Sequence, residues 1–293
     1  MVETARISVG QWCPVLGRLD ANITKLKDSV ERAADDGSEI LVTPELGLTG
    51  YLLKDLTPEM AMSVNDERLA EVAELSRRVP LVVGFVERGD DGQCYNSAGF
   101  WEDGGLVHVH RKISLPTYGL FDEGRFFARG DTVRTFPTRL GQLAILVCED
   151  LWHPSTALLA ALQGAVGLLV ASAAPGRGIS GNAAELDSRV TWKELVRVFG
   201  HLLGCWVAWS NRTGFEDGVY FTGGSMVLAP TGDAPLVEGD YFAEGTWTAE
   251  LDRSTVDRAR TGSGVLREED IEITHRQLGE ILEGRLPGGL HTP

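Results

Sequence analysis

The stretch AILVCEDLW, residues 144–152, decides the fold class, because an unbroken apolar run ends in a thiol followed by two acids. Runs of this kind are typical of strands that are buried on both faces, and we expect a strand over Gln142–Cys148. Similar runs recur on both sides of it, at Arg6–Gln11, Ile40–Thr43, Leu81–Val86, Val166–Ser172, Cys205–Asn211 and Ser225–Leu228. The sequence therefore predicts sheets whose faces are covered by other layers.

Stretches of helical period separate most of these strands. They predict helices from an N-cap at Asp20 to a stop at Gly37, over Asp66–Arg78, over His153–Gln163, and along an apolar face from Leu186 to Leu203. Tyr95–Trp101 and Leu106–Arg111 instead follow one another, and Gly104-Gly105 between them indicates a hairpin. Strand–helix–strand units mixed with a hairpin favour an α/β fold of two stacked sheets flanked by helices.

The chain divides into one large unit and a polar tail. We expect one domain over residues 1–252 and a C-terminal appendage over residues 253–293, with one helix near His275–Leu282. An appendage of this kind is expected to pack on another subunit.

Composition excludes several classes of protein. The 293 residues include 42 acidic and 27 basic side chains, a formal net charge of −15, which argues against nucleic acid and anionic membranes as partners. The four cysteines are scattered, so neither a disulfide framework nor a metal site is expected. The N-terminus does not read as a signal peptide, and the longest apolar run, 164–175, is shorter than the roughly 18 residues of a membrane span. We expect a cytoplasmic protein without metal or organic cofactor.

Three ionisable residues follow three predicted strands: Glu45, Lys112 and Cys148. Functional residues in α/β folds gather at the carboxyl ends of strands. A thiolate can attack a carbonyl carbon, a nearby cation is expected to lower the thiol pKa, and a carboxylate can move the protons. The ammonium can also face the developing oxyanion. This set of residues points to acyl transfer.

Each of the three also has an ordinary interpretation. Cys148 fits a buried structural cysteine, Glu45 a loop carboxylate, and Lys112 a solvated hairpin end. A Cys–His pair that uses His153 is a rival arrangement, but it leaves the carboxylate and the lysine without a role.

The sequence segments around these residues resemble those of a known family. TPELGLTGY (43–51), HRKISLPTYGLFDEGRFF (110–127) and LVCEDLW (146–152) resemble the three signature blocks of the nitrilase superfamily, and they look most like the glutaminase domain of glutamine-dependent NAD synthetases. The resemblance implies a four-layer αββα sandwich and a Glu–Lys–Cys triad. Glu45 is then the general base, Lys112 stabilises the tetrahedral intermediates, and Cys148 is the nucleophile. Glu123 matches a second carboxylate beside the lysine.

The same resemblance implies a substrate pocket. The matching positions are Tyr51, Tyr118, Phe121 and Glu149 and, in the loop ASAAPGRG, Ser172 and Arg177. Glu149 suits an α-ammonium group, although it also fits a role within the turn that exposes the nucleophile. Arg177 suits a carboxylate. The region 191–218, with Trp192, Trp206 and Trp209, fits either core packing or a reshaped pocket.

We expect a hydrolase that releases ammonia from a small amide through a thioester, with glutamine or a related ω-amide favoured. The phosphate loop Ser-Gly-Gly-x-Asp-Ser of NAD synthetases is absent from the sequence, so NAD synthesis by this sequence alone is not expected. The alternatives are an N-carbamoyl amidohydrolase, a nitrilase, or a glutaminase-like subunit that feeds ammonia to a separate synthetase. The resemblance also implies a homodimer or larger homo-oligomer.

Overall fold

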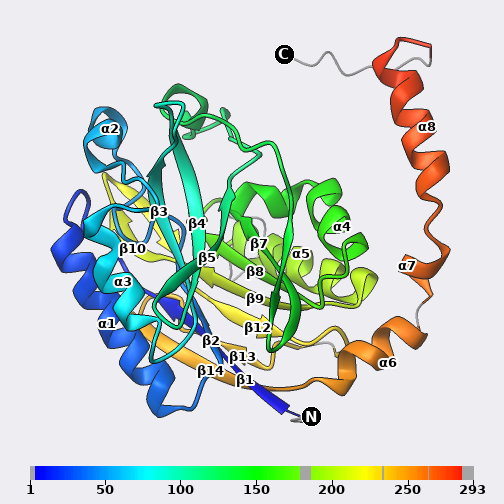
Figure 1. The fold of residues 1–293 in the computed structure, drawn as a ribbon, viewed down its shortest axis with the longest axis horizontal. Helices are drawn as coiled ribbons and strands as arrows, with labels where there is room; N and C mark the ends of the chain where they lie inside the picture. The colour runs from blue at the N-terminus through cyan, green and yellow to red at the C-terminus, as the bar shows by residue number, and fades with distance from the viewer. Residues whose placement is uncertain (1–3, 179–185, 233, 263, 286–293) are drawn as a thin grey trace.

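Two six-stranded sheets face each other in the computed structural model, which describes residues 4–178, 186–232, 234–262 and 264–285 (Figure 1). The first sheet has the spatial order β14 (Gly245–Asp252), β1 (Thr4–Gln11), β2 (Ile40–Val42), β3 (Leu81–Arg88), β4 (Cys94–Glu102) and β5 (Gly105–Arg111). The second has the order β13 (Val237–Glu238), β12 (Met226–Leu228), β9 (Trp206–Asn211), β8 (Gly167–Ser172), β7 (Gly141–Val147) and β6 (Thr135–Thr138). Two further strands, β10 (Thr213–Glu216) and β11 (Val219–Thr222), form a separate hairpin.

Alternation along β3 shows how each sheet is covered on both faces. Val82 belongs to the core between the two sheets, whereas Leu81, Val83 and Phe85 belong to a second core under the helices of the first sheet. Because successive side chains point to opposite faces, a continuous apolar strand supplies both cores at once. This pattern explains why the strand runs in the sequence show no polar face.

Helices complete the outer layers. The helix α1 (Leu19–Asp35) and the short α3 (Ala70–Leu75) cover the first sheet, and α4 (Pro154–Leu162) and α5 (Asp187–Leu203) cover the second (Figure 1). One more short helix, α2 (Thr57–Met60), and four 3-10 turns lie in loops: Lys54–Leu56, Glu67–Leu69, Glu123–Arg125 and Cys148–Trp152. The predicted four-layer αββα arrangement is confirmed.

Several local predictions need correction. Asp20 is not an N-cap: α1 begins at Leu19, so Asp20 lies inside the first turn, where its negative charge interacts favourably with the positive end of the helix dipole and it pairs with Arg18. The helix predicted over Asp66–Arg78 is shorter, because a 3-10 turn precedes α3. The predicted hairpin is confirmed, with Asp103 and Gly104 both at positive φ in its two-residue turn. The strands β6, β10, β11, β13 and β14 were not predicted.

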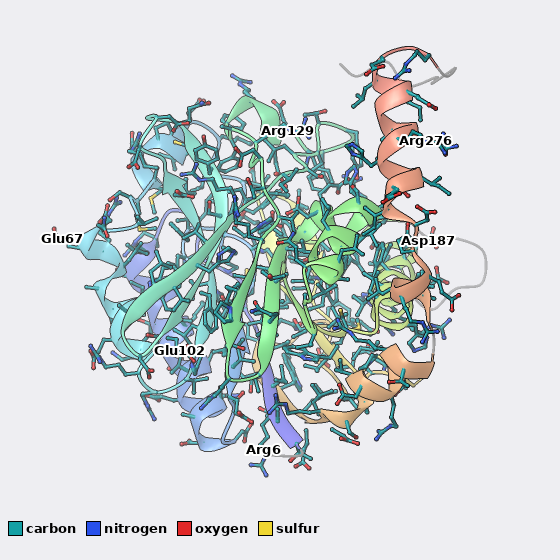
Figure 2. All side chains as sticks on the ribbon, turned by 45° about the vertical axis from the view of Figure 1, so that its right-hand side comes forward. Arg6, Glu67, Glu102, Arg129, Asp187 and Arg276 are labelled. Atoms are coloured by element: carbon teal, nitrogen blue, oxygen red, sulfur yellow. The ribbon has the colours of Figure 1, made fainter. Side chains whose placement is uncertain are left out.

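The C-terminal part divides at α6 (Ser254–Gly262), which packs on the body. Val256 joins the core between the sheets, and Arg260 donates to the backbone carbonyls of Ala165 and Gly204. After α7 (Val265–Glu268), α8 (Ile271–Leu282) stands beside the body without a buried residue, and it carries Arg276 (Figures 1 and 2). Among the described residues, no helix is long and apolar enough to cross a membrane.

Candidate active site

Glu45 lies in the turn after β2 with its carboxylate buried and fixed by three donors. Oε1 accepts hydrogen bonds from Lys112 Nζ at 2.7 Å and Asn96 Nδ2 at 2.8 Å, and Oε2 accepts one from Ala173 N at 2.8 Å. Gly84 in β3 permits this close approach, since a Cβ there would lie 2.5 Å from a backbone nitrogen of the turn. The carboxylate therefore keeps one direction, which a general base requires.

Cys148 is the first residue after β7 and begins a 3-10 turn. Its φ is +46°, in the left-handed region that residues other than glycine rarely adopt. Holding such a backbone costs on the order of 1–3 kcal/mol, and strain of this size is found mostly at functional sites. The side chain is 7% exposed. The turn thus brings the sulfur from a buried strand end to the edge of a pocket.

Lys112 follows β5 and joins two carboxylates inside the protein. Its Nζ lies 2.7 Å from Glu45 Oε1 and 2.7 Å from Glu123 Oε1, and its side chain is 1% exposed. Glu123 Oε1 also accepts a hydrogen bond from the hydroxyl of Tyr51. Glu123 Oε2 is buried and has no hydrogen-bond partner among the described residues. The structure thus brings the sequence-predicted carboxylates and lysine into one buried cluster.

The electrostatics of this cluster differ from the expectation for the thiol. Burial raises the pKa of Cys148 well above its usual value, Glu45 adds to the increase, and the opposing effect of Lys112 is smaller. Lys112 does lower the thiol pKa as expected, but burial and Glu45 outweigh this effect, so the net shift is upward. Cys148 therefore rests as a thiol, and it could act as a nucleophile only if a neighbouring group accepted its proton.

Two other groups in the cluster have shifted protonation. Burial raises the pKa of Glu123 to about 7, against the lowering effect of Lys112. Burial alone would lower the pKa of Lys112, but Glu123 and Glu45 outweigh it and raise that pKa well above its usual value. The lysine is therefore a permanent cation, while Glu123 exchanges a proton near neutral pH.

Asp150 is a buried carboxylate that connects several segments around the site through hydrogen bonds. Its Oδ1 accepts from Ile113 N at 3.0 Å and Ser114 N at 2.9 Å, and its Oδ2 accepts from His110 Nε2 at 2.8 Å and from a backbone N–H of β7 at 3.1 Å. Burial acts to raise the pKa of Asp150, but these hydrogen bonds lower it below the usual value. One carboxylate therefore ties the turn that begins at Cys148 to the segment directly after the lysine.

A pocket of about 280 Å³ opens at Cys148. Four of the sequence-predicted substrate residues line it together with the sulfur: Tyr118, Phe121, Glu149 and Arg177. The other lining residues are Trp152, Ala174, Pro175, Gly178, Asp187, Ser188, Thr191 and Trp192. Asp187 is the first residue of α5 and is labelled in Figure 2.

Tyr51 and Ser172 do not line this pocket. Tyr51 lies behind it and lines a separate hollow of about 170 Å³ with Phe121 and Glu123. Ser172 is fully buried, and its Oγ accepts a hydrogen bond from Trp209 Nε1 at 2.8 Å. The main reason is position in the strand: Ser172 is still part of β8, and the pocket begins two residues later.

Polar groups in the pocket come from segments on both sides of Cys148 in the sequence. The Tyr118 hydroxyl donates to both oxygens of Glu149, at 3.0 and 3.2 Å. Burial and this contact raise the pKa of Tyr118 to about 12, so it stays a donor. Arg177 lies 4.6 Å from the centre of the Phe121 ring, and its Nη2 is buried without a hydrogen-bond partner among the described residues. The pocket therefore offers a carboxylate, from Glu149, and a guanidinium, from Arg177. These groups suit a ligand that carries both a positive and a negative charge.

The tryptophans of the region 191–218 fall into two groups. Trp206 and Trp209 are core residues. Trp192 stacks on Trp209 with ring centres 5.0 Å apart and meets Trp152 edge-on at 5.6 Å, which makes the pair 152/192 a wall of the pocket. Trp192 also belongs to this core, so core packing describes all three tryptophans, and Trp192 lines the pocket as well.

The sequence reasoning missed two residues of the site. Asn96 donates to Glu45, and its only sequence signal is a polar side chain in the middle of an apolar strand. Asp150 lies within CEDLW, but no local pattern shows that it reaches across to another segment. No cluster of three His, Cys, Asp or Glu side chains suitable for a metal occurs in the described part of the chain.

Comparison with known proteins places this site in a family. The family model "Carbon-nitrogen hydrolase" matches residues 6–261, which include α6. A glutamine-dependent NAD(+) synthetase of Thermotoga maritima is 31% identical over 254 residues, which are 86% of this chain and 42% of that protein. The chain thus spans less than half of that relative's length.

Two other proteins match along nearly their whole length. A citrullinase of Francisella tularensis is 27% identical over 266 residues, 86% of this chain and 91% of that protein. The crystal structure of a carbon-nitrogen hydrolase from Helicobacter pylori superposes with a TM-score of 0.83 at 25% identity, covering 94% of this chain and 98% of that one. On the family match and on this fold, the chain belongs to the carbon–nitrogen hydrolases of the nitrilase superfamily.

Proposed function

We propose that the chain hydrolyses a small primary amide, with glutamine or a related ω-amide as the first candidate. The observation that supports this proposal is the buried cluster around Lys112, whose two carboxylates act electrostatically on the Cys148 thiol at the edge of a pocket. Acid–base and nucleophilic groups with these contacts suit acyl transfer better than a structural role, because a buried cluster of charges is costly to maintain.

The first half of the proposed reaction forms a thioester. Cys148 Sγ attacks the amide carbonyl carbon while its proton passes to Glu45. The carbonyl oxygen becomes an oxyanion, and Lys112 stabilises it with an N–H, since two of its three donors point to carboxylates. The proton on Glu45 then passes to the nitrogen, the carbon–nitrogen bond breaks, and ammonia leaves.

The second half restores the enzyme. Water attacks the thioester carbon while Glu45 takes one of its protons, and the tetrahedral intermediate collapses with cleavage of the carbon–sulfur bond. The proton returns to the sulfur, and the free acid leaves. Glu123 supports both half-reactions through its ion pair with the ammonium group of Lys112.

The substrate's charged end is proposed to lie along the pocket wall. Glu149 is placed to hold an ammonium group and Arg177 a carboxylate, while Tyr118 and Phe121 pack beside the carbon chain. Tyr51 does not touch the substrate; it acts through its hydrogen bond to Glu123. Ser172 has no role in substrate binding, because its hydroxyl accepts a hydrogen bond from Trp209.

The test measures ammonia release from a panel of primary amides, N-carbamoyl amino acids and nitriles by the wild type and Cys148→Ala. We expect turnover of glutamine or another ω-amide by the wild type, and loss of nearly all of it in the variant. Cys94→Ala is the matched control, because that cysteine is partly exposed and does not line the pocket. Absence of ammonia from every compound in the panel contradicts the proposal.

A second candidate is hydrolysis of an N-carbamoyl group. It is favoured by the similarity to the citrullinase, which spans 91% of that protein, whereas the synthetase relative extends far beyond the match. Release of carbon dioxide together with ammonia would identify this activity. Acid formed from a nitrile would instead identify a nitrilase.

A third candidate is a glutaminase-like subunit that supplies ammonia to a separate synthetase, as the synthetase relatives suggest. It predicts low activity of the isolated chain and co-purification with a synthetase-like partner. Robust turnover by the isolated chain would remove it.

We also propose that the chain forms a homodimer or a larger homo-oligomer through α8. An isolated helix of 12 residues is marginal in water, and this one exposes Ile271, Leu278, Ile281 and Leu282. A second copy is the partner always present at equal concentration. Light scattering should show at least a dimer for the wild type and a smaller species for Leu278→Asp; a monomeric wild type contradicts the proposal.

A further inference from the structure

A buried ion pair lies at the base of the β10–β11 hairpin, outside the catalytic cluster. Arg212 Nη1 is 2.7 Å from Glu216 Oε2, and their side chains are 0% and 3% exposed. The guanidinium carbon also lies 4.1 Å from the centre of the Phe221 ring. Apolar side chains of similar volume often stabilise a fold as well as a buried ion pair does, so stability alone does not explain this one.

The second oxygen of Glu216 holds the loop that carries Tyr51. Oε1 accepts hydrogen bonds from Tyr51 N at 2.9 Å and Leu52 N at 2.6 Å. Gly50 has φ +82°, and a Cβ there would lie 2.9 Å from Glu216 Oε2. The loop is therefore built around this carboxylate, with room for nothing larger than glycine beside it.

Tyr51 connects this loop to the catalytic cluster. Its hydroxyl donates to Glu123 Oε1, the same oxygen that accepts from Lys112. Its ring meets the Phe221 ring edge-on with centres 5.9 Å apart, and the Phe221 ring also contacts the guanidinium of Arg212. The ion pair thus fixes Tyr51 at two places: its backbone N–H and its ring.

The backbone of Arg212 makes a second connection to the cluster. Its N–H donates to the carbonyl oxygen of Ser172 at 3.2 Å, and the N–H of Glu45 donates to the same oxygen at 3.3 Å. One carbonyl oxygen therefore holds both the turn that carries Glu45 and the backbone of Arg212.

We propose that Arg212 and Glu216 are positioning residues that hold the Tyr51 phenol against the catalytic cluster. They touch neither the thiol nor the pocket, and they act through the hydrogen bond from Tyr51 to Glu123. Their effect on turnover rests on the proposed function, whereas their effect on the cluster itself can be measured without a substrate.

The expected direction follows from the groups that face Glu123, which are Lys112, Glu45, Tyr51 and Cys148. The phenol donates to the carboxylate, which favours its charged form and lowers the pKa of Glu123 from the value that burial would give. Loss or misplacement of the phenol therefore raises that pKa. Ionised Glu123 in turn raises the pKa of the Cys148 thiol, so thiol reactivity reports the change.

The experiment follows alkylation of Cys148 by iodoacetamide between about pH 5 and 9, with intact mass as the readout. The wild type should show an inflection as Glu123 ionises. Tyr51→Phe and Glu216→Gln should each move that inflection to higher pH. Because both act on one hydrogen bond, Glu216→Gln should add no further shift in the Tyr51→Phe background.

Matched variants separate positioning from general damage. Arg260→Met removes a part-buried arginine that holds backbone carbonyls far from the cluster; it should lower the melting temperature and leave the inflection in place. Arg212→Lys keeps the charge and should shift the inflection less than Arg212→Met.

For turnover of an amide, Glu216→Gln should lower kcat about 10- to 100-fold and change KM less. The inference is overturned if the inflection of Glu216→Gln matches that of the wild type, or if its shift adds fully to that of Tyr51→Phe. Failure of the proposed function would appear differently: the predicted shifts of the alkylation inflection would still be seen, but no amide would be hydrolysed.

Discussion

Replacement of Lys112 by methionine tests the charge balance of the buried cluster. Methionine keeps most of the volume of the lysine but leaves Glu45 and Glu123 buried without their shared cation. Removal of one partner from a buried ion pair costs about 3–5 kcal/mol, because the remaining charge loses both water and its counter-ion. We therefore expect folding to survive with a clear loss of stability.

The loss can be converted into a change of melting temperature. The entropy of unfolding is about 2.1 cal/mol/K per residue, which for a chain of 293 residues is about 0.6 kcal/mol/K. A loss of about 3–5 kcal/mol then lowers the melting temperature by roughly 5–8 °C. Lys25→Met is the control, since Lys25 and its partner Glu244 are partly exposed and such pairs are worth about 1 kcal/mol or less.

The stability of Lys112→Met is also expected to depend on pH in a way that the wild type does not share. The lysine lowers the pKa of Glu123, so its removal raises that pKa above the value of about 7 in the wild type. A folded-state pKa above the unfolded value makes stability fall as pH rises through it. The stability gap between wild type and Lys112→Met should therefore widen from about pH 6 to about pH 9.

Thermal unfolding followed by circular dichroism at both pH values measures the gap. In the double variant Lys112→Met/Glu123→Gln the gap should not widen, and at the higher pH this variant should be more stable than Lys112→Met alone. A gap of equal size at both pH values, or no rescue by the second substitution, refutes the electrostatic reasoning.

Three further predictions concern the proton path, Asp150 and the pocket. Glu45→Gln should slow alkylation of Cys148 at neutral pH by about 100-fold or more, since the thiol then lacks its proton acceptor; an unchanged rate speaks against the base. Asp150→Asn should cost about 1–3 kcal/mol. Because the folded-state pKa of Asp150 is lowered, that cost is present at neutral pH and should shrink as denaturation is measured toward acid; a cost independent of pH is the opposing result. Glu149→Gln should raise KM for glutamine more than it lowers kcat, as steady-state kinetics can show; the reverse split assigns Glu149 to the turn.

The sequence was a good guide to the layers and to the position of Glu45, Lys112 and Cys148 after strands. Apolar runs such as AILVC predicted the central strands because a strand buried on both faces has no polar alternation to confuse the pattern. Glu45, Lys112 and Cys148 could be placed at strand ends for the same reason. Short edge strands such as β6 and β13 were missed, because two to four residues carry too little periodicity.

Contacts between distant segments were beyond local patterns. Glu216 holds the backbone of Tyr51 across 165 positions in the sequence, and the hydrogen bond between Asp150 and Ile113 spans 37 positions. The sequence immediately around Glu216 and around Asp150 does not distinguish either residue from an ordinary acidic residue in a turn. The thiol pKa was misjudged for a similar reason, since the sequence names a nearby lysine but does not show that burial and Glu45 outweigh it.

The central claim is that Cys148 carries the acyl group between two half-reactions. Partitioning with hydroxylamine tests it most directly: the wild type is incubated with the amide that it hydrolyses, and hydroxamate is measured against free acid as hydroxylamine is increased. The thioester mechanism predicts hydroxamate at the expense of acid in the wild type, and neither product above background in Cys148→Ala. Turnover retained by Cys148→Ala, or free acid formed in the same amount whatever the hydroxylamine concentration, would contradict it.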